Sequence, residues 1–174
     1  MVGNLVHIPG APHSLPGVAG SSHARRMRFP VAALSWLSAA CVTAIHAENW
    51  PCWRGPRLDG TSTDAGVPTT WSPTEHIAWK TPLPGLGHAS PIVWGNRVFT
   101  VTCIPDREER VLLCLDRDTG RILWQQVVVK SMLEGKHPLN SHASSTPATD
   151  GERVYVSFLD VKEVVVAEIG RAHV

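Results

Sequence analysis

This sequence of 174 residues has no excess of charge of one sign. Sixteen Lys and Arg stand against 15 Asp and Glu, which gives a formal net charge of +1. A chain so close to neutral has no basic field that would attract nucleic acid or an anionic membrane surface. Long hydrophobic runs are lacking as well, because the main apolar run, residues 31–45, is shorter than the roughly 18 residues of a membrane span. We therefore expect no nucleic-acid partner and no transmembrane segment.

Acidic residues are absent from the first 47 positions, so the head of the chain differs from its body. The only charges in the head are three arginines within residues 25–28, directly before the apolar run, and the small residue Ala47 follows that run. This pattern is typical of a secretory signal, so we expect a periplasmic or secreted protein, cleaved before Glu48. The alternative is a lipid anchor on Cys41, for which the Leu expected three positions earlier is missing.

Two terminal stretches are not expected to belong to the folded body. Residues 1–26 are no part of an ordinary signal, and we interpret them as an upstream extension of a chain that starts at Met27, or as a long disordered leader. Residues 168–174 can be back-translated into the start of a common sequencing adapter. We expect this heptapeptide to be an artefact that ends a truncated gene, so the body comprises residues 48–167.

A sustained helical period is lacking, and short β-prone runs between turn residues take its place. Residues 90–99 and 146–155 repeat one pattern: Ser/Thr-Pro, a short run, a Gly-containing turn, and Arg-Val followed by an aromatic residue. Gly95-Asn96 and Asp150-Gly151 are two-residue turns typical of β-hairpins. Short consecutive strands of this kind predict an all-β meander.

The first repeat unit is expected to form four strands, which lie at residues 91–94, 97–103, 110–116 and 121–129. The second unit ends within its third strand, at residues 163–167, and irregular structure is expected at residues 48–75 and 130–142. A single four-stranded sheet cannot bury both of its faces, so it needs neighbouring sheets to stack on.

The fourth strand of the first unit begins with a recognisable motif. Residues 115–124 read Leu-Asp-Arg-Asp-Thr-Gly-Arg-Ile-Leu-Trp, which resembles the Leu-Asp-x-x-Thr-Gly-x-x-x-Trp signature of pyrroloquinoline-quinone-type β-propeller repeats. Residues 49–56 and 77–85 resemble the opening of secreted members of that family. The resemblance implies a fragment of a β-propeller with four-stranded antiparallel blades, of which fewer than two are present.

Two tryptophans occupy similar settings in this pattern. A large flat side chain on an outer strand suits stacking between blades, and Trp124 lies on the outer strand of the first blade. By resemblance, residues 76–81, with Trp79, would form a lone outer strand that closes the ring on the last blade. The expected organisation is an N-terminal segment, a first blade and an incomplete second blade, at residues 48–89, 90–130 and 131–167.

The turn before the fourth strand carries oxygen-bearing side chains that invite a calcium interpretation. Calcium loops of the Asp-x-Asp-x-Asp-Gly type with a later Glu are absent, however. We interpret Asp116 and Thr119 as residues that cap the turn, with Gly120 in a backbone conformation of positive φ.

Cysteine is scarce, and no pair has the spacing of a zinc site. Cleavage of the signal leaves Cys52, Cys103 and Cys114, an odd number, so at least one thiol is unpaired. On a hairpin centred near Arg107, Cys103 would face Val111, three residues from Cys114 and too far for a disulfide. We expect buried structural thiols.

His88 and His142 are the candidate ligand contacts. Each precedes the innermost strand of its unit, and in a propeller that position lies near the central channel. Two imidazoles on neighbouring blades could bind a metal ion or an anionic ligand, whereas the simpler interpretation is that both are ordinary turn histidines.

The residues favour a non-catalytic scaffold over an enzyme, because no catalytic motif is present. The expected role is an exported binding module that contacts other proteins through loops and strand edges, similar to the outer-membrane assembly lipoproteins of the resembled family. The alternative is a periplasmic quinoprotein dehydrogenase, which would need pyrroloquinoline quinone and calcium. None of the ligands that these cofactors require can be matched here, so we expect no cofactor. A secreted sugar- or polymer-binding module stays open as well.

Overall fold

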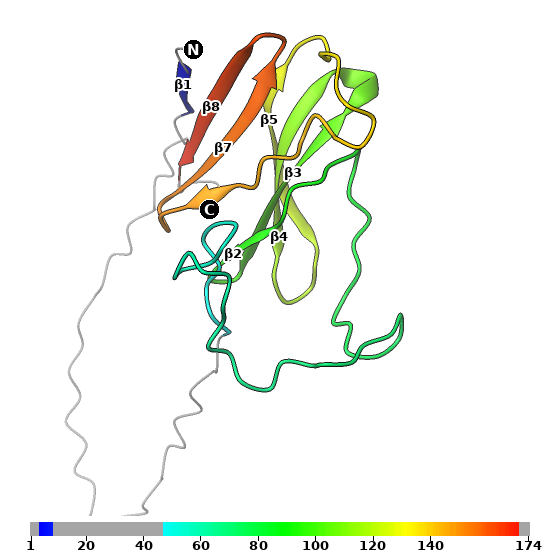
Figure 1. The fold of residues 1–174 in the computed structure, drawn as a ribbon, viewed down its shortest axis with the longest axis vertical. Coiled ribbons are helices and arrows are strands. Elements are labelled where there is room, and N and C mark those ends of the chain that lie inside the picture. Colours follow the sequence, from blue (N-terminus) through cyan, green and yellow to red (C-terminus); the bar gives the residue numbers. More distant parts are fainter. Residues whose placement is uncertain (1–3, 9–46, 171–174) are drawn as a thin grey trace, which may run out of the picture. The chain divides into compact units, whose positions relative to one another are not determined.

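The structure of the protein is a computed structural model that describes residues 4–8 and 47–170. The expected signal segment, including Cys41, and residues 171–174 lie outside the described residues. Every regular element of the described part is a β-strand, apart from one short 3-10 helix, η1 (Pro105–Arg107) (Figure 1). The all-β prediction is therefore confirmed.

The first blade is a four-stranded antiparallel sheet whose strands follow chain order (Figure 1). Its strands are β2 (Ile92–Trp94), β3 (Arg97–Ile104), β4 (Glu109–Asp116) and β5 (Ile122–Lys130). Valine, isoleucine, threonine and aromatic residues dominate the runs, and these side chains suit a pleated, half-buried surface. Each expected strand boundary lies within one residue of the observed one.

The hairpin between β3 and β4 corrects the predicted register. Pro105 opens the 3-10 turn, and Glu108 closes it with a left-handed φ of 55°. Cys103 consequently pairs with Arg110 and not with Val111, because the hairpin is centred between residues 106 and 107. The cysteines that the structure describes are all free, as this spacing requires, but only Cys103 and Cys114 are buried and Cys52 is half-buried.

The second sheet has the order β1-β8-β7-β6. Its strands are β6 (Ala148–Thr149), β7 (Arg153–Asp160), β8 (Glu163–Gly170) and β1 (Asn4–Ile8). The β6–β7 and β7–β8 pairs are antiparallel, as expected, but β8 extends three residues beyond the predicted strand end. Ile169 is fully buried in the core, so the first three residues of the adapter-like heptapeptide belong to the folded sheet. Their origin stays a prediction.

Strand β1 was not expected from the sequence. It lies parallel to β8, with Asn4 opposite Val165 and Ile8 opposite Ile169. An outer strand without a neighbour presents a row of backbone N–H and C=O groups, which can pair with any extended segment within reach. Here a segment from the upstream stretch takes the fourth position of the second sheet.

The two blades share one hydrophobic core. One face of the first sheet supplies Ile92, Phe99 and Leu112, and the second sheet supplies Val156 and Phe158 among others. Successive strand residues point to opposite faces. Residues of the two sheets thus meet face to face, which is how a sheet that cannot cover itself is buried.

The opposite face of the first sheet is covered by an irregular segment. Val111, Leu113 and Leu115 of β4 are buried on that face. Residues 76–81, expected as an outer strand, form no strand, and the only pairing among residues 51–91 comes from isolated bridges of Ser72 with Glu75 and Leu86 with Cys103. A strand requires a partner ladder, and the last blade that residues 76–81 were expected to close is not among the described residues, so their role in ring closure stays a prediction.

Candidate functional site

The fold brings His88 and His142 to the wall of one pocket of about 400 Å³. His88 precedes β2 and His142 precedes β6. The backbone N–H of His88 donates to the carbonyl oxygen of Ala143 at 3.0 Å, which joins the two segments where each blade begins. The sequence repeat therefore places both imidazoles on the same pocket. Their role as ligand contacts stays a prediction.

Several other polar side chains line this pocket, namely Lys136, Asn140 and Ser141. His142 is half-buried, and its Nε2 donates to the carbonyl oxygen of Glu134 at 2.8 Å, because a carbonyl oxygen can only accept. This bond sets the ring tautomer and directs Nδ1 to act as an acceptor in the neutral imidazole. An ammonium, two imidazoles and neutral polar groups are chemically suited to a polar or anionic ligand.

The rim of the same pocket is apolar. Leu86, Pro105, Leu133 and Pro138 contribute to its lining. Leu86 is 66% exposed, and in the adjoining loop Met132 and Leu139 are 63% and 82% exposed. Apolar side chains that gather in solvent around a pocket are typical of a contact surface for another protein.

The loop that carries His142 is anchored by a buried ion pair that sequence reasoning missed. Arg110, on β4, is 0% exposed, and its guanidinium binds the carboxylate of Glu134. Arg110 Nη1 also donates to the carbonyl oxygen of Ser131 at 2.7 Å and to its hydroxyl at 2.9 Å. In the sequence, Arg110 stands at a strand end beside polar loop residues, where arginines are usually solvated. No local signal marked it as buried.

Asp116 and Thr119 shape the turn between β4 and β5. Asp116 Oδ1 accepts hydrogen bonds from the backbone N–H groups of Asp118 and Thr119, at 3.1 and 2.9 Å, and from the Thr119 hydroxyl at 2.8 Å. The Thr119 hydroxyl, followed by the two N–H groups, lowers the pKa of the Asp116 carboxyl. Asp116 Oδ1 therefore accepts its hydrogen bonds within its own turn.

Trp79 packs on this turn. Its indole Nε1 donates to the carbonyl oxygen of Arg117 at 2.8 Å, and the Thr81 hydroxyl donates to the carbonyl oxygen of Gly120 at 2.6 Å. Gly120 has a φ of +70°, and a Cβ there would lie 2.4 Å from the Trp79 ring. The glycine is therefore needed for its conformation and for the close approach of the indole.

Trp124 lies on β5, the outer strand of the first sheet. Its ring is tilted against Phe99, with the ring centroids 6.0 Å apart, and it is packed on the edge of the shared core. This is an aromatic pair of ordinary geometry, which contributes to the stability of the blade.

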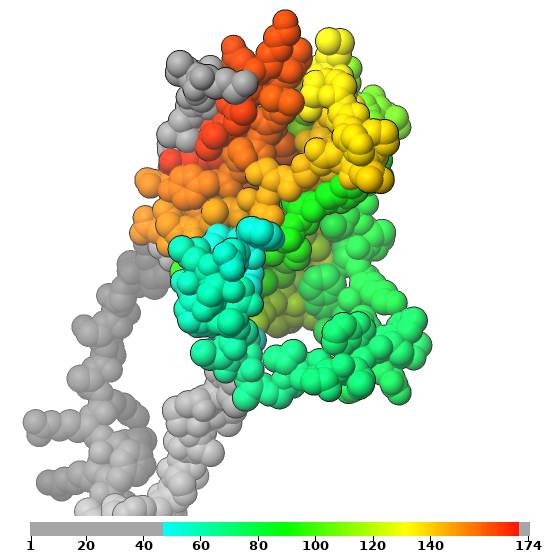
Figure 2. Space-filling view, in the orientation of Figure 1, coloured from blue at the N-terminus to red at the C-terminus, as the bar shows by residue number. Residues whose placement is uncertain are grey.

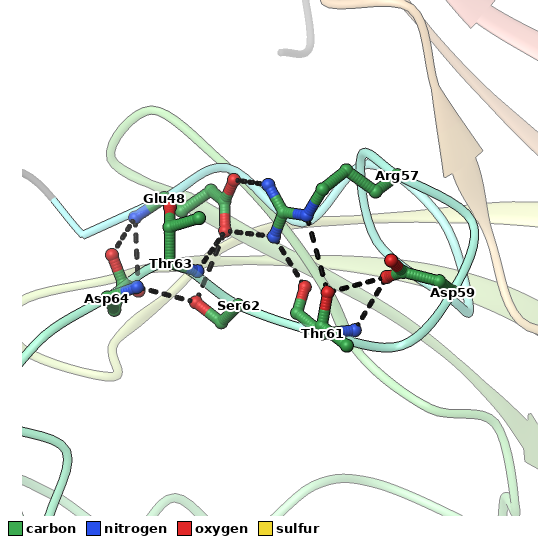
Figure 3. Close-up of polar contacts among 7 residues, drawn as sticks. All are labelled: Glu48, Arg57, Asp59, Thr61, Ser62, Thr63 and Asp64. Atoms are coloured by element: carbon green, nitrogen blue, oxygen red, sulfur yellow. Dashed lines mark hydrogen bonds and ion pairs between the residues drawn. The ribbon is translucent and has the colours of Figure 1, made fainter.

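A second polar cluster lies in the N-terminal loop, at the surface of the protein (Figures 2 and 3). Arg57 donates from Nη1 and Nη2 to the two carboxylate oxygens of Glu48, at 2.5 and 2.9 Å. The Ser62 hydroxyl and the Thr63 N–H donate to the same carboxylate at 3.2 and 3.3 Å. The hydrogen bond from Arg57 is the main reason why the pKa of Glu48 falls to about 2.

Two observations bear on the quinoprotein alternative, which stays open. Within residues 4–8 and 47–170, no three His, Cys, Asp or Glu side chains gather into a group that could hold a metal ion. Cys103 and Cys114 lie in the core, where burial raises the pKa of both thiols, that of Cys114 to about 12. Thiols with a raised pKa are unreactive at neutral pH.

Comparison with known protein families shows to which family this chain belongs. Residues 60–169, more than half of the chain, match the family described as outer membrane protein assembly factor BamB, of the pyrroloquinoline-quinone-type repeat class. The chain belongs to this family. No curated protein and no solved structure matches the chain.

Membership of the BamB family confirms the resemblance that residues 115–124 indicated. The sheets are consistent with part of a β-propeller: one four-stranded blade and three consecutive strands, β6 to β8, of a second. The match extends to residue 169, almost the end of β8. None of the helices in the described part is long and apolar enough to cross a membrane.

Proposed function

We propose that this chain is an exported, non-catalytic propeller module that binds other proteins in outer membrane protein assembly. The observation that carries the proposal is the exposed Leu86 on the wall of the pocket between the two blades, together with the exposed Met132 and Leu139, which adjoin the lining residues Leu133 and Pro138 in the chain. The description of the family supports a partner of this class. Export by a cleaved signal is supported by the arginines within residues 25–28 and by the apolar run, with lipidation of Cys41 as the alternative.

The binding surface can be tested by site-specific photo-crosslinking. A photoreactive amino acid at Leu139 should yield a covalent product with an outer membrane protein, or with a component of the assembly machinery, in an export-competent bacterium. The same amino acid at Val67, which is 63% exposed in another loop, is the control and should not. Leu86→Asp should weaken the Leu139 product. Equal products at both sites, or none, would argue against this surface.

The absence of a cofactor is a separate part of the proposal. Titration of the exported chain with pyrroloquinoline quinone, with and without calcium, should give no saturable change in tryptophan fluorescence. The physical reason is that no carboxylate cluster is available within the described residues to hold the calcium ion. Saturable binding would instead favour the quinoprotein dehydrogenase.

A further inference from the structure

The loop of residues 48–64 folds back so that its first residue meets its last (Figure 3). The backbone nitrogen of Glu48 donates to both carboxylate oxygens of Asp64, at 2.9 and 3.2 Å. The Glu48 carboxylate accepts hydrogen bonds from Arg57 at the same time, so the residue is fixed both through its backbone and through its side chain. Both ends of this arrangement lie within the described residues.

The position of this contact coincides with the expected site of processing. The bond that a signal peptidase would cut is the one between Ala47 and Glu48. Hydrolysis of that peptide bond consumes one water molecule, leaves a carboxylate on Ala47, and converts the Glu48 amide nitrogen into a protonated α-amino group. The nitrogen that already faces Asp64 would then carry a positive charge.

We propose that Asp64 is a docking site for the new N-terminus that cleavage before Glu48 creates. The inference rests on the proposed export. The ammonium group brings two more hydrogens and a full charge to a carboxylate that already lies within hydrogen-bonding distance, and charge-assisted hydrogen bonds are stronger than neutral ones. Cleavage therefore tightens the loop of residues 48–64 in the mature protein relative to the precursor.

Little is lost at this site when the leader is removed. The Ala47 carbonyl oxygen accepts a hydrogen bond from Arg117 Nη1 at 3.3 Å, and the same nitrogen donates to the Gly95 carbonyl oxygen at 3.3 Å. Arg117 keeps the second partner after cleavage. Glu48 likewise keeps its hydrogen bonds with Ser62 and Thr63, which involve only its side chain.

The test measures how well the α-amino group of the exported protein is protected. The full chain is expressed in a bacterium that exports it, the N-terminus of the mature product is sequenced, and the rate of α-amine labelling by a succinimidyl ester is followed by mass spectrometry. Asp64→Asn is the test variant. Asp59→Asn is the matched control, because Asp59 lies in the same loop but binds Thr61 and not Glu48.

Two results would support the docking, and two others would overturn it or the cleavage. Asp64→Asn should speed α-amine labelling about two- to fivefold, the size of effect given by one exposed ion pair, while Asp59→Asn should leave the rate unchanged. A serine inserted before Glu48 moves the ammonium group by one residue and should make the rate insensitive to Asp64→Asn. A mature chain that starts at Glu48 but labels equally in both variants would overturn the docking alone. A different N-terminus would overturn the proposed cleavage as well.

Discussion

At the scale of single residues, the contact between Trp79 and the β4–β5 turn depends on a glycine that has no side chain. Gly120 combines a φ of +70° with a Trp79 ring that would lie 2.4 Å from any Cβ. A non-glycine residue in the left-handed region is strained, and here it would also push the indole from its hydrogen bond with the Arg117 carbonyl oxygen. Gly120 of the motif is therefore required for the close packing of Trp79 on this turn.

Gly120→Ala should lower the free energy of unfolding by about 1–3 kcal/mol, from backbone strain together with the clash at Trp79. Thermal unfolding of the full 174-residue chain, which retains β1, measures the change. Gly66→Ala is the matched control, since Gly66 has a similar φ of +76° and nothing lies within 4 Å of a Cβ built there. Equal effects of the two substitutions would show that the contact with Trp79 does not matter.

Glu48 predicts a pH dependence of the N-terminal loop. The hydrogen bond from Arg57 is the main cause that lowers the pKa of the Glu48 carboxyl from the ordinary 4.5 to about 2 in the folded loop. As the pH falls, the unfolded chain takes up this proton first, so the stabilisation is complete above about 4.5 and is lost as the pH falls to about 2. The protection factor of the Thr63 amide, which removes the intrinsic pH dependence of exchange, should fall through this range, and Glu48→Gln should abolish that fall.

At the scale of elements, the buried ion pair between β4 and the following loop determines where His142 lies. Arg110 is fully buried, and Glu134 both neutralises it and accepts the hydrogen bond from His142. A charge enclosed in this way is tolerated only while its partner is present. The pocket wall therefore depends on a contact between residues 24 positions apart.

Glu134→Gln should lower the free energy of unfolding by about 3 kcal/mol, because it leaves the buried guanidinium without a counter-charge. The double variant Arg110→Met, Glu134→Leu should lose less, since no unpaired charge remains. Urea denaturation separates these outcomes, with the exposed Glu163→Gln as the control. A double variant that is less stable than Glu134→Gln would contradict this account.

At the scale of the whole molecule, the edges of the sheets are the weak points. Strand β5 is the outer strand of the first blade, and Val127 on it is 39% exposed. Strand β8 is paired on its outer side with β1, which precedes the expected cleavage site. Cleavage before Glu48 would therefore remove β1 and open the backbone edge of β8.

Residues 48–174 expressed alone should be poorly soluble or only partly folded, because two open edges and an apolar rim promote association. Chemical denaturation followed by tryptophan fluorescence gives the measurement. A single cooperative transition from a soluble monomer would show instead that this segment is a self-sufficient domain.

The amino-acid sequence by itself determined the strands of the first blade, the positions of the hairpins but not the register of the β3–β4 hairpin, and the family. These depend on local patterns: alternation along residues 97–104, turn residues such as Gly95-Asn96, and the motif that ends at Trp124. Only the tertiary structure decided that His88 and His142 share a pocket, that Arg110 is buried against Glu134, and that Trp79 and Thr81 bind the β4–β5 turn without forming a strand. The physical reason is that these contacts join segments far apart in the chain, and they form only once the sheets stack.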